Sequence, residues 1–156
     1  MVIRPARETD IPQILALLSQ VLTLHALLRP DIFISDTTKY TEEELQNIFR
    51  NEETPVFVAA DEKDAVLGYA FCMLREPPFK NTMRPRKSMF IDDFCVDETC
   101  RGRGIGEKLF RFVLEEAKRR GCADVTLNVW AGNDGARRFY ERMGMRPKET
   151  QMELCF

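Results

Sequence analysis

Residues 90–96 read Phe-Ile-Asp-Asp-Phe-Cys-Val, and residues 101–106 read Arg-Gly-Arg-Gly-Ile-Gly, directly before an amphipathic stretch. The first segment has the composition of a strand, and the stretch from 107 to 120 has helical spacing. Amide groups at the start of a helix lack intrahelical partners and lie at the positive end of the helix dipole. Glycines let an anion approach these amides closely. The order of strand, glycine turn and helix therefore predicts a phosphate-binding loop, to which Arg101 and Arg103 add positive charge.

Two other kinds of phosphate loop do not fit this segment. A Walker A loop requires Lys and then Ser or Thr after its last glycine, whereas Glu107 follows Gly106. The dinucleotide-binding fingerprint requires the glycine spacing GxGxxG, whereas the glycines here stand at positions 102, 104 and 106. The flanking strands also have hairpin spacing rather than the βαβ order of that fold.

The elements on either side of this segment predict one α+β domain over residues 1–156. Asp10 is an N-cap candidate for the first helix, and Thr41 with Glu44 forms a capping box for the second. The segments 24–39 and 76–87 are expected to be irregular. The expected strands are 1–5, 55–60, 65–75, 88–96, 125–129 and 148–156, and the last two helices are 107–120 and 133–143.

Composition excludes several classes of protein. The formal net charge of -2 gives no electrostatic argument for nucleic acid or an anionic membrane as partner. No apolar run approaching a membrane span and no signal peptide are apparent. Five cysteines without a CxxC pair, and the single histidine His25, argue against a metal site. We therefore expect a cytoplasmic protein with reduced thiols and no metal.

Two motifs carry a resemblance to a known family. Arg101, Gly104 and Gly106 match the pattern Arg/Gln-x-x-Gly-x-Gly/Ala of the GNAT superfamily of N-acetyltransferases. Downstream, residues 133–144 match its pattern Asn-x-x-Ala-x-x-Phe-Tyr-x-x-x-Gly, and residues 3–6 resemble its opening strand. The resemblance implies a three-layer sandwich, in which helices flank a central mixed, mostly antiparallel sheet, and acetyl-CoA as co-substrate.

Within that superfamily, residues 92–96 and 101–106 are similar to diamine (spermidine/spermine) acetyltransferases. The likeness is local, so it makes polyamines one candidate class of acceptor among several.

The resemblance places acetyl-CoA between the strand that ends at Val96 and the strand that ends near Trp130. Backbone groups of 94–96 would pair with the pantetheine arm, and the N–H near Val96 would stabilise the oxyanion. Asn133 is expected to be an N-cap in addition to a cofactor contact. The predicted cofactor contacts are Phe94, Cys95, Val96, Arg101, Gly102, Arg103, Gly104, Ile105, Gly106, Glu107, Asn133, Ala136 and Arg137.

Tyr140 is the predicted general acid. A phenol with an ordinary pKa of about 10 is protonated at neutral pH and can protonate the leaving thiolate. The alternative role for Tyr140 is that of a core tyrosine in an amphipathic helix.

Asp92 and Asp93 are neighbours on a strand, so we expect their side chains on opposite faces. Asp92, on the face of Phe94 and Val96, is the predicted amine anchor or base, by resemblance to the diamine enzymes. The alternative is a strand-end carboxylate in a salt bridge.

Three further residues are predicted to contact the acceptor. His25 lies where the family usually builds its acceptor site, although it can equally be a packed or solvated histidine. Asn128 and Trp130 lie opposite Val125 and Leu127, and Trp130 can equally be core.

The sequence thus predicts an acetyl-CoA-dependent N-acetyltransferase acting on a primary amine, that of a small molecule, by direct attack in a ternary complex. A protein or peptide N-terminal acetyltransferase is one alternative, and an acyl-CoA-binding module without turnover is another. Tyr140 argues against the second alternative, because a module that only binds needs no acid. From the resemblance we also expect a homodimer, in which the final strand pairs or swaps between subunits.

Overall fold

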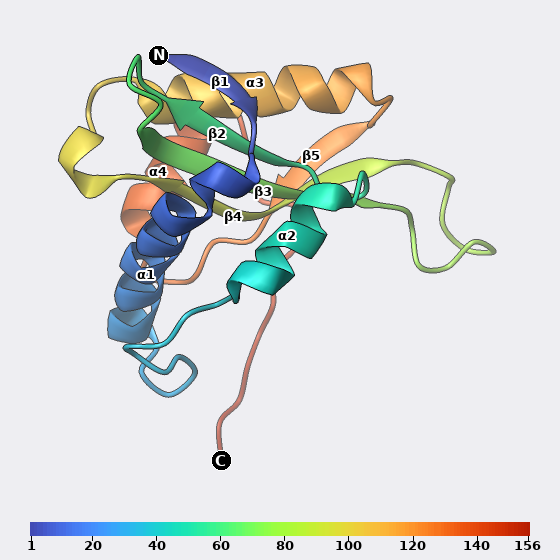
Figure 1. The fold of residues 1–156 in the computed structure, drawn as a ribbon. Helices are drawn as coiled ribbons and strands as arrows, with labels where there is room; N and C mark the ends of the chain where they lie inside the picture. Colours follow the sequence, from blue (N-terminus) through green and yellow to red (C-terminus); the bar gives the residue numbers. More distant parts are fainter.

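A five-stranded sheet with strand order β1-β2-β3-β4-β5 forms the middle layer of the protein (Figure 1). The computed structural model describes all of residues 1–156. The first four strands pair antiparallel, and β4 pairs parallel with β5. The predicted mixed, mostly antiparallel sheet is therefore confirmed. The strands are β1 (Val2–Pro5), β2 (Val56–Ala60), β3 (Val66–Arg75), β4 (Ser88–Val96) and β5 (Asp124–Leu127).

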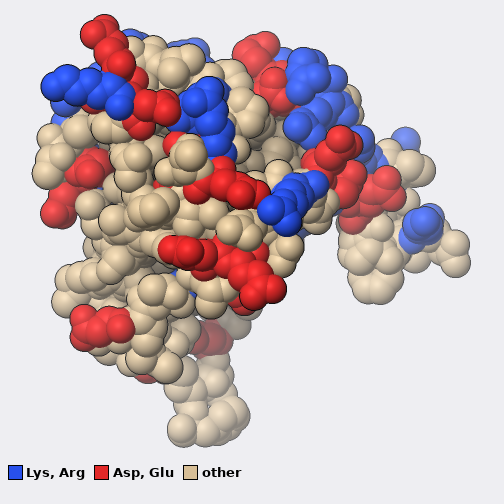
Figure 2. Space-filling view, in the orientation of Figure 1, with Lys and Arg blue, Asp and Glu red and all other residues tan.

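Helices α1 (Ile11–Leu28) and α2 (Glu42–Arg50) cover one face of the sheet (Figure 1). Apolar residues at helical spacing in α1, Ile11, Ile14 and Leu18, are buried against β2 and β3. The capping box that starts α2 is confirmed, because Thr41 Oγ1 accepts from the Glu44 amide at 3.2 Å and the Thr41 amide donates to Glu44 Oε2 at 2.7 Å. Acidic side chains gather over the start of α2 in the space-filling view (Figure 2).

Helices α3 (Ile105–Arg119) and α4 (Asp134–Arg142) cover the opposite face of the sheet. The predicted apolar stripe of α3 is buried there against the sheet, together with Phe139 and Tyr140 of α4. The three-layer sandwich is therefore confirmed. The members of that stripe are Leu109, Phe110, Val113 and Ala117.

Asp10 has a different role from the one its position predicted. Its carboxylate makes no hydrogen bond to a helix amide of α1. Instead it accepts two hydrogen bonds from the buried guanidinium of Arg4, at 2.7 and 2.9 Å, and one from the Arg7 amide. This buried ion pair ties β1 to the start of α1, and the 3₁₀ turn η1 (Glu8–Asp10) lies between them.

Several element boundaries differ from the expectation. The helix α1 continues to Leu28, so residues 24–28, predicted to be irregular, are helical. Leucine and alanine favour helix, and the helix ends where Pro30 disfavours a helical Arg29. A second 3₁₀ turn, η2 (Glu98–Cys100), precedes the glycine turn.

The expected final strand over residues 148–156 is wrong. This segment forms no strand, and its chain leaves the sheet as an extended tail (Figure 1). The large apolar side chains of Met152, Leu154 and Phe156 are exposed. The tail pairs with no strand of the sheet, and a salt bridge of 2.7 Å between Arg29 and Glu153 connects it to the end of α1.

The helical segment Glu8–Leu28 is long and apolar enough to cross a membrane, by length and composition only. The expectation that no apolar run approaches this length was therefore wrong. The same composition is found in core helices of proteins without membrane spans. Here Ile11, Ile14, Leu17 and Leu18 are buried against the sheet, so the feature is weak evidence for a membrane span.

Candidate active site

The site is built around a gap between β4 and β5. The two strands pair only over residues 88–91 of β4 and 124–127 of β5. Beyond Ile91, β4 continues for five residues to Val96 and pairs with β3 alone. One edge of residues 92–96 is therefore open to an added partner, at the place where the resemblance put the pantetheine arm.

A β-bulge at Asp92 changes which way the acidic pair faces. In the register of β3 and β4, Phe71 lies opposite Asp93 and Cys72 lies opposite Ile91, so Asp92 has no partner. A bulge breaks the strict alternation of side chains along a strand. Consequently Lys39 Nζ lies 2.9 Å from Asp92 Oδ2 and 3.1 Å from Asp93 Oδ2. The prediction that the two carboxylates lie on opposite faces is therefore wrong, and Asp92 does not share the face of Phe94.

Asp93 lies deeper in this site than Asp92. The side chain of Asp93 is 8% exposed, against 24% for Asp92. The Tyr69 hydroxyl donates to Asp93 Oδ1 at 3.2 Å, and the Tyr40 hydroxyl donates to Asp92 Oδ2 at 3.3 Å. Sequence reasoning missed Lys39, Tyr40 and Tyr69. The only signal was the acidic pair itself, two adjacent charges in an otherwise apolar strand.

The charges of this cluster shift the pKa values around it. Partial burial alone would lower the pKa of Lys39, but the charge of Asp93 and the hydrogen bond that Lys39 donates to Asp92 outweigh burial and raise it. Burial lowers the pKa of His25; the charge of Asp93 opposes that shift, and the charge of Lys39 adds to it. The raised pKa keeps Lys39 in its ammonium form at neutral pH, and the lowered pKa favours the neutral imidazole of His25.

Tyr140 projects from α4 into the aromatic cluster beside the open edge of β4. Its ring lies 6.2 Å from that of Phe94 and 5.8 Å from that of Phe110, centroid to centroid. Burial, followed by the charges of Asp93 and Cys95, raises the pKa of Tyr140 above its ordinary value. The phenol therefore keeps its proton at neutral pH. The same shift makes it a weaker acid, so it would donate only as the thiolate forms.

Aromatic rings at the end of α1 form one wall near the site. The ring of Phe33 lies 5.1 Å from that of His25 and 5.3 Å from that of Trp130. The guanidinium of Arg29 lies 5.8 Å above the Trp130 ring. The structure thus brings His25 and Trp130 together, as expected for two residues of one pocket. Asn128 is exposed beyond the end of β5, and its role stays a prediction.

The glycine turn lies between β4 and α3, as the sequence predicted, and two of its glycines have a left-handed backbone conformation. Gly102 and Gly104 have φ of 75° and 74°, and Gly104 is the N-cap of α3. A Cβ on Gly106 would lie 3.4 Å from Val96 Cγ2 and 3.5 Å from the ring of Phe139, so α3 begins in close contact with β4 and α4. The first amides of α3 have no intrahelical partners and are therefore available to an anion bound at this turn.

The arginines of the turn make contacts of their own. Arg101 Nε donates to the Val96 carbonyl at 3.2 Å, which ties the turn to the end of β4. Arg103 lies beside the Cys100 sulfur at 3.8 Å. Arg137 pairs with Glu141 at 2.9 Å along the exposed side of α4. The predicted cofactor contacts of all three arginines stay predictions.

Asn133 is confirmed as the N-cap of α4, because its Oδ1 accepts from the Ala136 amide at 3.2 Å. From this cap, α4 runs to Phe139 and Tyr140, whose rings lie 5.9 and 6.2 Å from that of Phe94 on β4. No cluster of three or more His, Cys, Asp or Glu side chains is arranged to hold a metal ion. The five cysteines are unpaired thiols, and burial raises the pKa of Cys95 to about 12.

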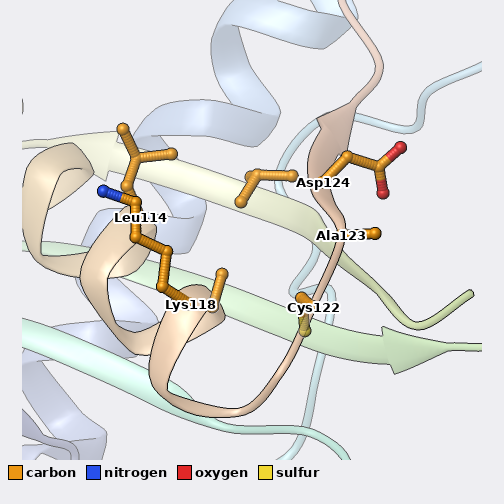
Figure 3. A pocket seen from close by; sticks show the side chains of 7 residues that line it. Leu114, Lys118, Cys122, Ala123 and Asp124 are labelled. Atoms are coloured by element: carbon orange, nitrogen blue, oxygen red, sulfur yellow. The ribbon is translucent and has the colours of Figure 1, made fainter.

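A separate pocket of about 170 Å³ lies between the end of α3 and β5 (Figure 3). Leu114, Lys118, Cys122 and Asp124 are among its lining residues. Its charged groups have partners: Lys118 pairs with Glu115 at 2.8 Å, and Asp124 binds Arg86 at 2.9 Å. It contains none of the predicted site residues.

The site thus combines an open strand edge, a glycine turn, a helix start, an acidic cluster and an aromatic cluster, an arrangement typical of an enzyme with a phosphate-containing cofactor. The comparisons agree with this class. The acetyltransferase (GNAT) family model matches residues 21–145, so the chain belongs to this family.

Three proteins illustrate the likeness. The BH1408 protein from Bacillus halodurans, as a tetramutant, has a TM-score of 0.95 and 35% identity over 100% of both chains. Glucosamine 6-phosphate N-acetyltransferase 1 from rice (Oryza sativa subsp. japonica) is 36% identical over 65% of this chain, which spans 58% of the rice protein's length. Thialysine N-epsilon-acetyltransferase from cattle (Bos taurus) is 28% identical over 100% of this chain and 91% of its own length.

Proposed function

We propose that the protein transfers an acetyl group from acetyl-CoA to a primary amine of a small molecule, by direct attack in a ternary complex. The observation that carries this proposal is the open edge of β4 at residues 92–96, which has the cofactor turn at one end and the Asp92–Asp93 cluster at the other. The names of the rice and cattle relatives also specify amine acceptors of low molecular mass.

The family's acetyl-CoA fits the groups that are present. Helix-start amides at Ile105 to Glu107 would bind the pyrophosphate, and backbone groups of Phe94 to Val96 would pair with the pantetheine arm. A Cβ at Gly106 would crowd Val96 and Phe139, so glycine at this position lets the start of α3 lie close to the end of β4. Acetyl-CoA would supply the activated acyl group as a thioester.

The proposed reaction moves two protons. The neutral amine attacks the thioester carbonyl carbon, a C–N bond forms, and the C–S bond breaks. The amine nitrogen loses its proton to a base, for which a water bound to Asp92 or the neutral imidazole of His25 is suited, while the two carboxylates themselves hold a cation. Tyr140 gives its proton to the departing thiolate and regains one from solvent. The amide near Val96 stabilises the oxyanion.

The test is to incubate the purified protein with acetyl-CoA and an amine panel, and to follow release of free thiol. The panel contains diamines and polyamines, thialysine, glucosamine 6-phosphate, aminoglycosides and short peptides with varied N-termini. Amine-dependent release with a small molecule supports the proposal. Release with peptides alone would favour the N-terminal acetyltransferase alternative. Acetyl-CoA binding without release from any amine would favour a binding module.

We also propose a homodimer, in which the tail of residues 148–156 packs on a second copy. Its alternating apolar side chains, Met152, Leu154 and Phe156, are exposed in the single chain, and β5 has one unpaired edge. Deletion of residues 148–156 would then shift the protein from dimer to monomer in sedimentation experiments. If the truncated protein had the same number of chains per particle as the full-length protein, the proposal would be contradicted. A cytoplasmic location stays a prediction.

A further inference from the structure

The ammonium of Lys39 is held by the two carboxylates at the centre of the proposed acceptor site. Lys39 lies 53 residues before Asp92 in the chain, on the connection between α1 and α2, and its Nζ is 2.9 Å from Asp92 Oδ2 and 3.1 Å from Asp93 Oδ2. The Lys39 ammonium also lies 5.3 Å from the centre of the Tyr40 ring. Two carboxylates and one aromatic face together form a receptor for an ammonium group.

The two carboxylates are fixed, whereas the lysine can leave. Tyr69 holds Asp93 and Tyr40 holds Asp92 through hydrogen bonds, and both carboxylates stand on β4 within the sheet. The Lys39 side chain is 37% exposed, against 8% for that of Asp93. It extends on four rotatable methylene groups from a connecting segment. Withdrawal of Lys39 would therefore leave the receptor in place with a charge of -2.

A group held in this receptor is not the amine that reacts. Nucleophilic attack requires a lone pair, and an ammonium between two carboxylates is held in its charged form. A cation that replaced Lys39 would therefore serve as an anchor. The amine to be acetylated would belong to another part of the same acceptor, closer to the open edge of β4.

We propose that Lys39 is a specificity-determining residue: its ammonium fills the acceptor's anchor position in the free enzyme, and an acceptor with a second, non-reacting cationic group must displace it. This inference rests on the proposed function. Lys39 acts as an internal competitor, which lowers the affinity for dicationic acceptors and affects singly charged amines much less.

The test compares Lys39→Met with the wild type and with two controls. Lys39→Arg keeps the competing cation, and Lys63→Met removes an exposed lysine from the β2–β3 hairpin. For a diamine, Lys39→Met should lower KM at least about threefold with kcat unchanged, the size expected for one partly exposed ion pair. For a monoamine of similar length, the change should be smaller. Both controls should behave as the wild type.

Equilibrium binding separates failure of this inference from failure of the proposed function. Isothermal titration of the same diamine should show tighter binding to Lys39→Met, even if no thiol is released. Equal or weaker diamine binding by a folded Lys39→Met protein would overturn the inference. An equal increase in affinity for the diamine and the monoamine in Lys39→Met would also overturn the inference. Displacement of Lys39 by a second cation predicts a larger increase for the diamine. Absence of thiol release with every amine would count against the proposed function alone.

Discussion

The hydroxyl of Tyr69 on β3 donates a 3.2 Å hydrogen bond to Oδ1 of Asp93 on β4. This bond leaves Oδ2 of Asp93 directed at Lys39, beside the carboxylate of Asp92. The deeper carboxylate is therefore fixed by the sheet, and the shallower one by Tyr40. The proposed acceptor site thus contains two carboxylates with different degrees of burial and different partners.

Asp93→Asn should reduce kcat/KM for the best amine acceptor more than Asp92→Asn. The buried carboxylate acts in a lower effective dielectric, so loss of its charge removes more of the interaction with a cation. We expect at least a tenfold loss for Asp93→Asn, which corresponds to about 1.4 kcal/mol. Glu115→Gln on the exposed face of α3 is the control. A larger loss of kcat/KM in Asp92→Asn would show that Asp92, the residue predicted from the sequence, is the main anchor.

Tyr140→Phe should lower kcat at least tenfold, on the order of the contribution of one general acid, and leave the dissociation constant of acetyl-CoA within about twofold. Phenylalanine keeps the ring contacts with Phe94 and Phe110 and removes only the proton donor. Stopped-flow thiol release gives kcat, and calorimetry gives the acetyl-CoA affinity. The general-acid role would be refuted by unchanged turnover in a variant that melts at the wild-type temperature.

His25 should titrate below the ordinary histidine pKa, and this can be followed by proton NMR because it is the only histidine in the chain. Burial lowers its pKa, Lys39 lowers it further, and Asp93 raises it. Lys39→Met should therefore raise the His25 pKa, and Asp93→Asn should lower it. A pKa that is insensitive to both substitutions would mean that the imidazole does not face the acidic cluster.

Gly104→Ala should weaken acetyl-CoA binding, whereas Gly121→Ala should not. Both glycines have φ of 74°, and a Cβ added at either position would meet open space, so each substitution should destabilise the fold by a similar amount, about 1 kcal/mol. Only Gly104 stands at the N-terminus of α3, beside the proposed pyrophosphate site. Calorimetric titration of both variants measures the difference. If Gly104→Ala and Gly121→Ala bound acetyl-CoA with equal affinity, the turn would not be part of the cofactor site.

Asp10→Ala should lower the free energy of unfolding by about 3 kcal/mol, because it removes a partner from the buried guanidinium of Arg4. Burial alone would raise the pKa of Asp10, but the hydrogen bonds from Arg4 and Arg7 outweigh it, so the folded-state pKa is lowered. The contribution of Asp10 to the free energy of unfolding is then fully present above its unfolded-state pKa of about 3.9. That contribution is lost as the pH falls through the folded-state pKa of Asp10.

Urea unfolding of wild type and Asp10→Ala at several pH values measures this difference, which should shrink as the pH falls below about 4. Glu8→Ala is the control, since Glu8 pairs with Arg50 at the exposed surface and its loss should cost less than about 1 kcal/mol. If the difference in the free energy of unfolding between wild type and Asp10→Ala did not change with pH, the ion pair would not be the source of the stabilisation.

Local patterns were sufficient to predict much of the fold. The Thr41 capping box, the stripe of α3 and the Asn133 cap depend on residues within a few positions of one another, so the sequence displays them directly. The glycine turn is of the same kind, because positive φ at Gly104 is a local requirement. The final strand failed as a prediction because alternation of apolar residues does not by itself fix strand pairing: residues 148–156 form no strand although one edge of β5 is unpaired.

The sequence by itself determined the family, the three-layer arrangement, the glycine turn and the choice of Tyr140 as candidate acid, because each follows from a motif or a periodicity of neighbouring residues. Only the tertiary structure decided how the proposed acceptor site is arranged. The bulge at Asp92 arises from the register between β3 and β4, and it turns both carboxylates toward Lys39. That lysine comes from 53 residues away, and contacts over such separations are fixed by packing of whole elements rather than by any local pattern.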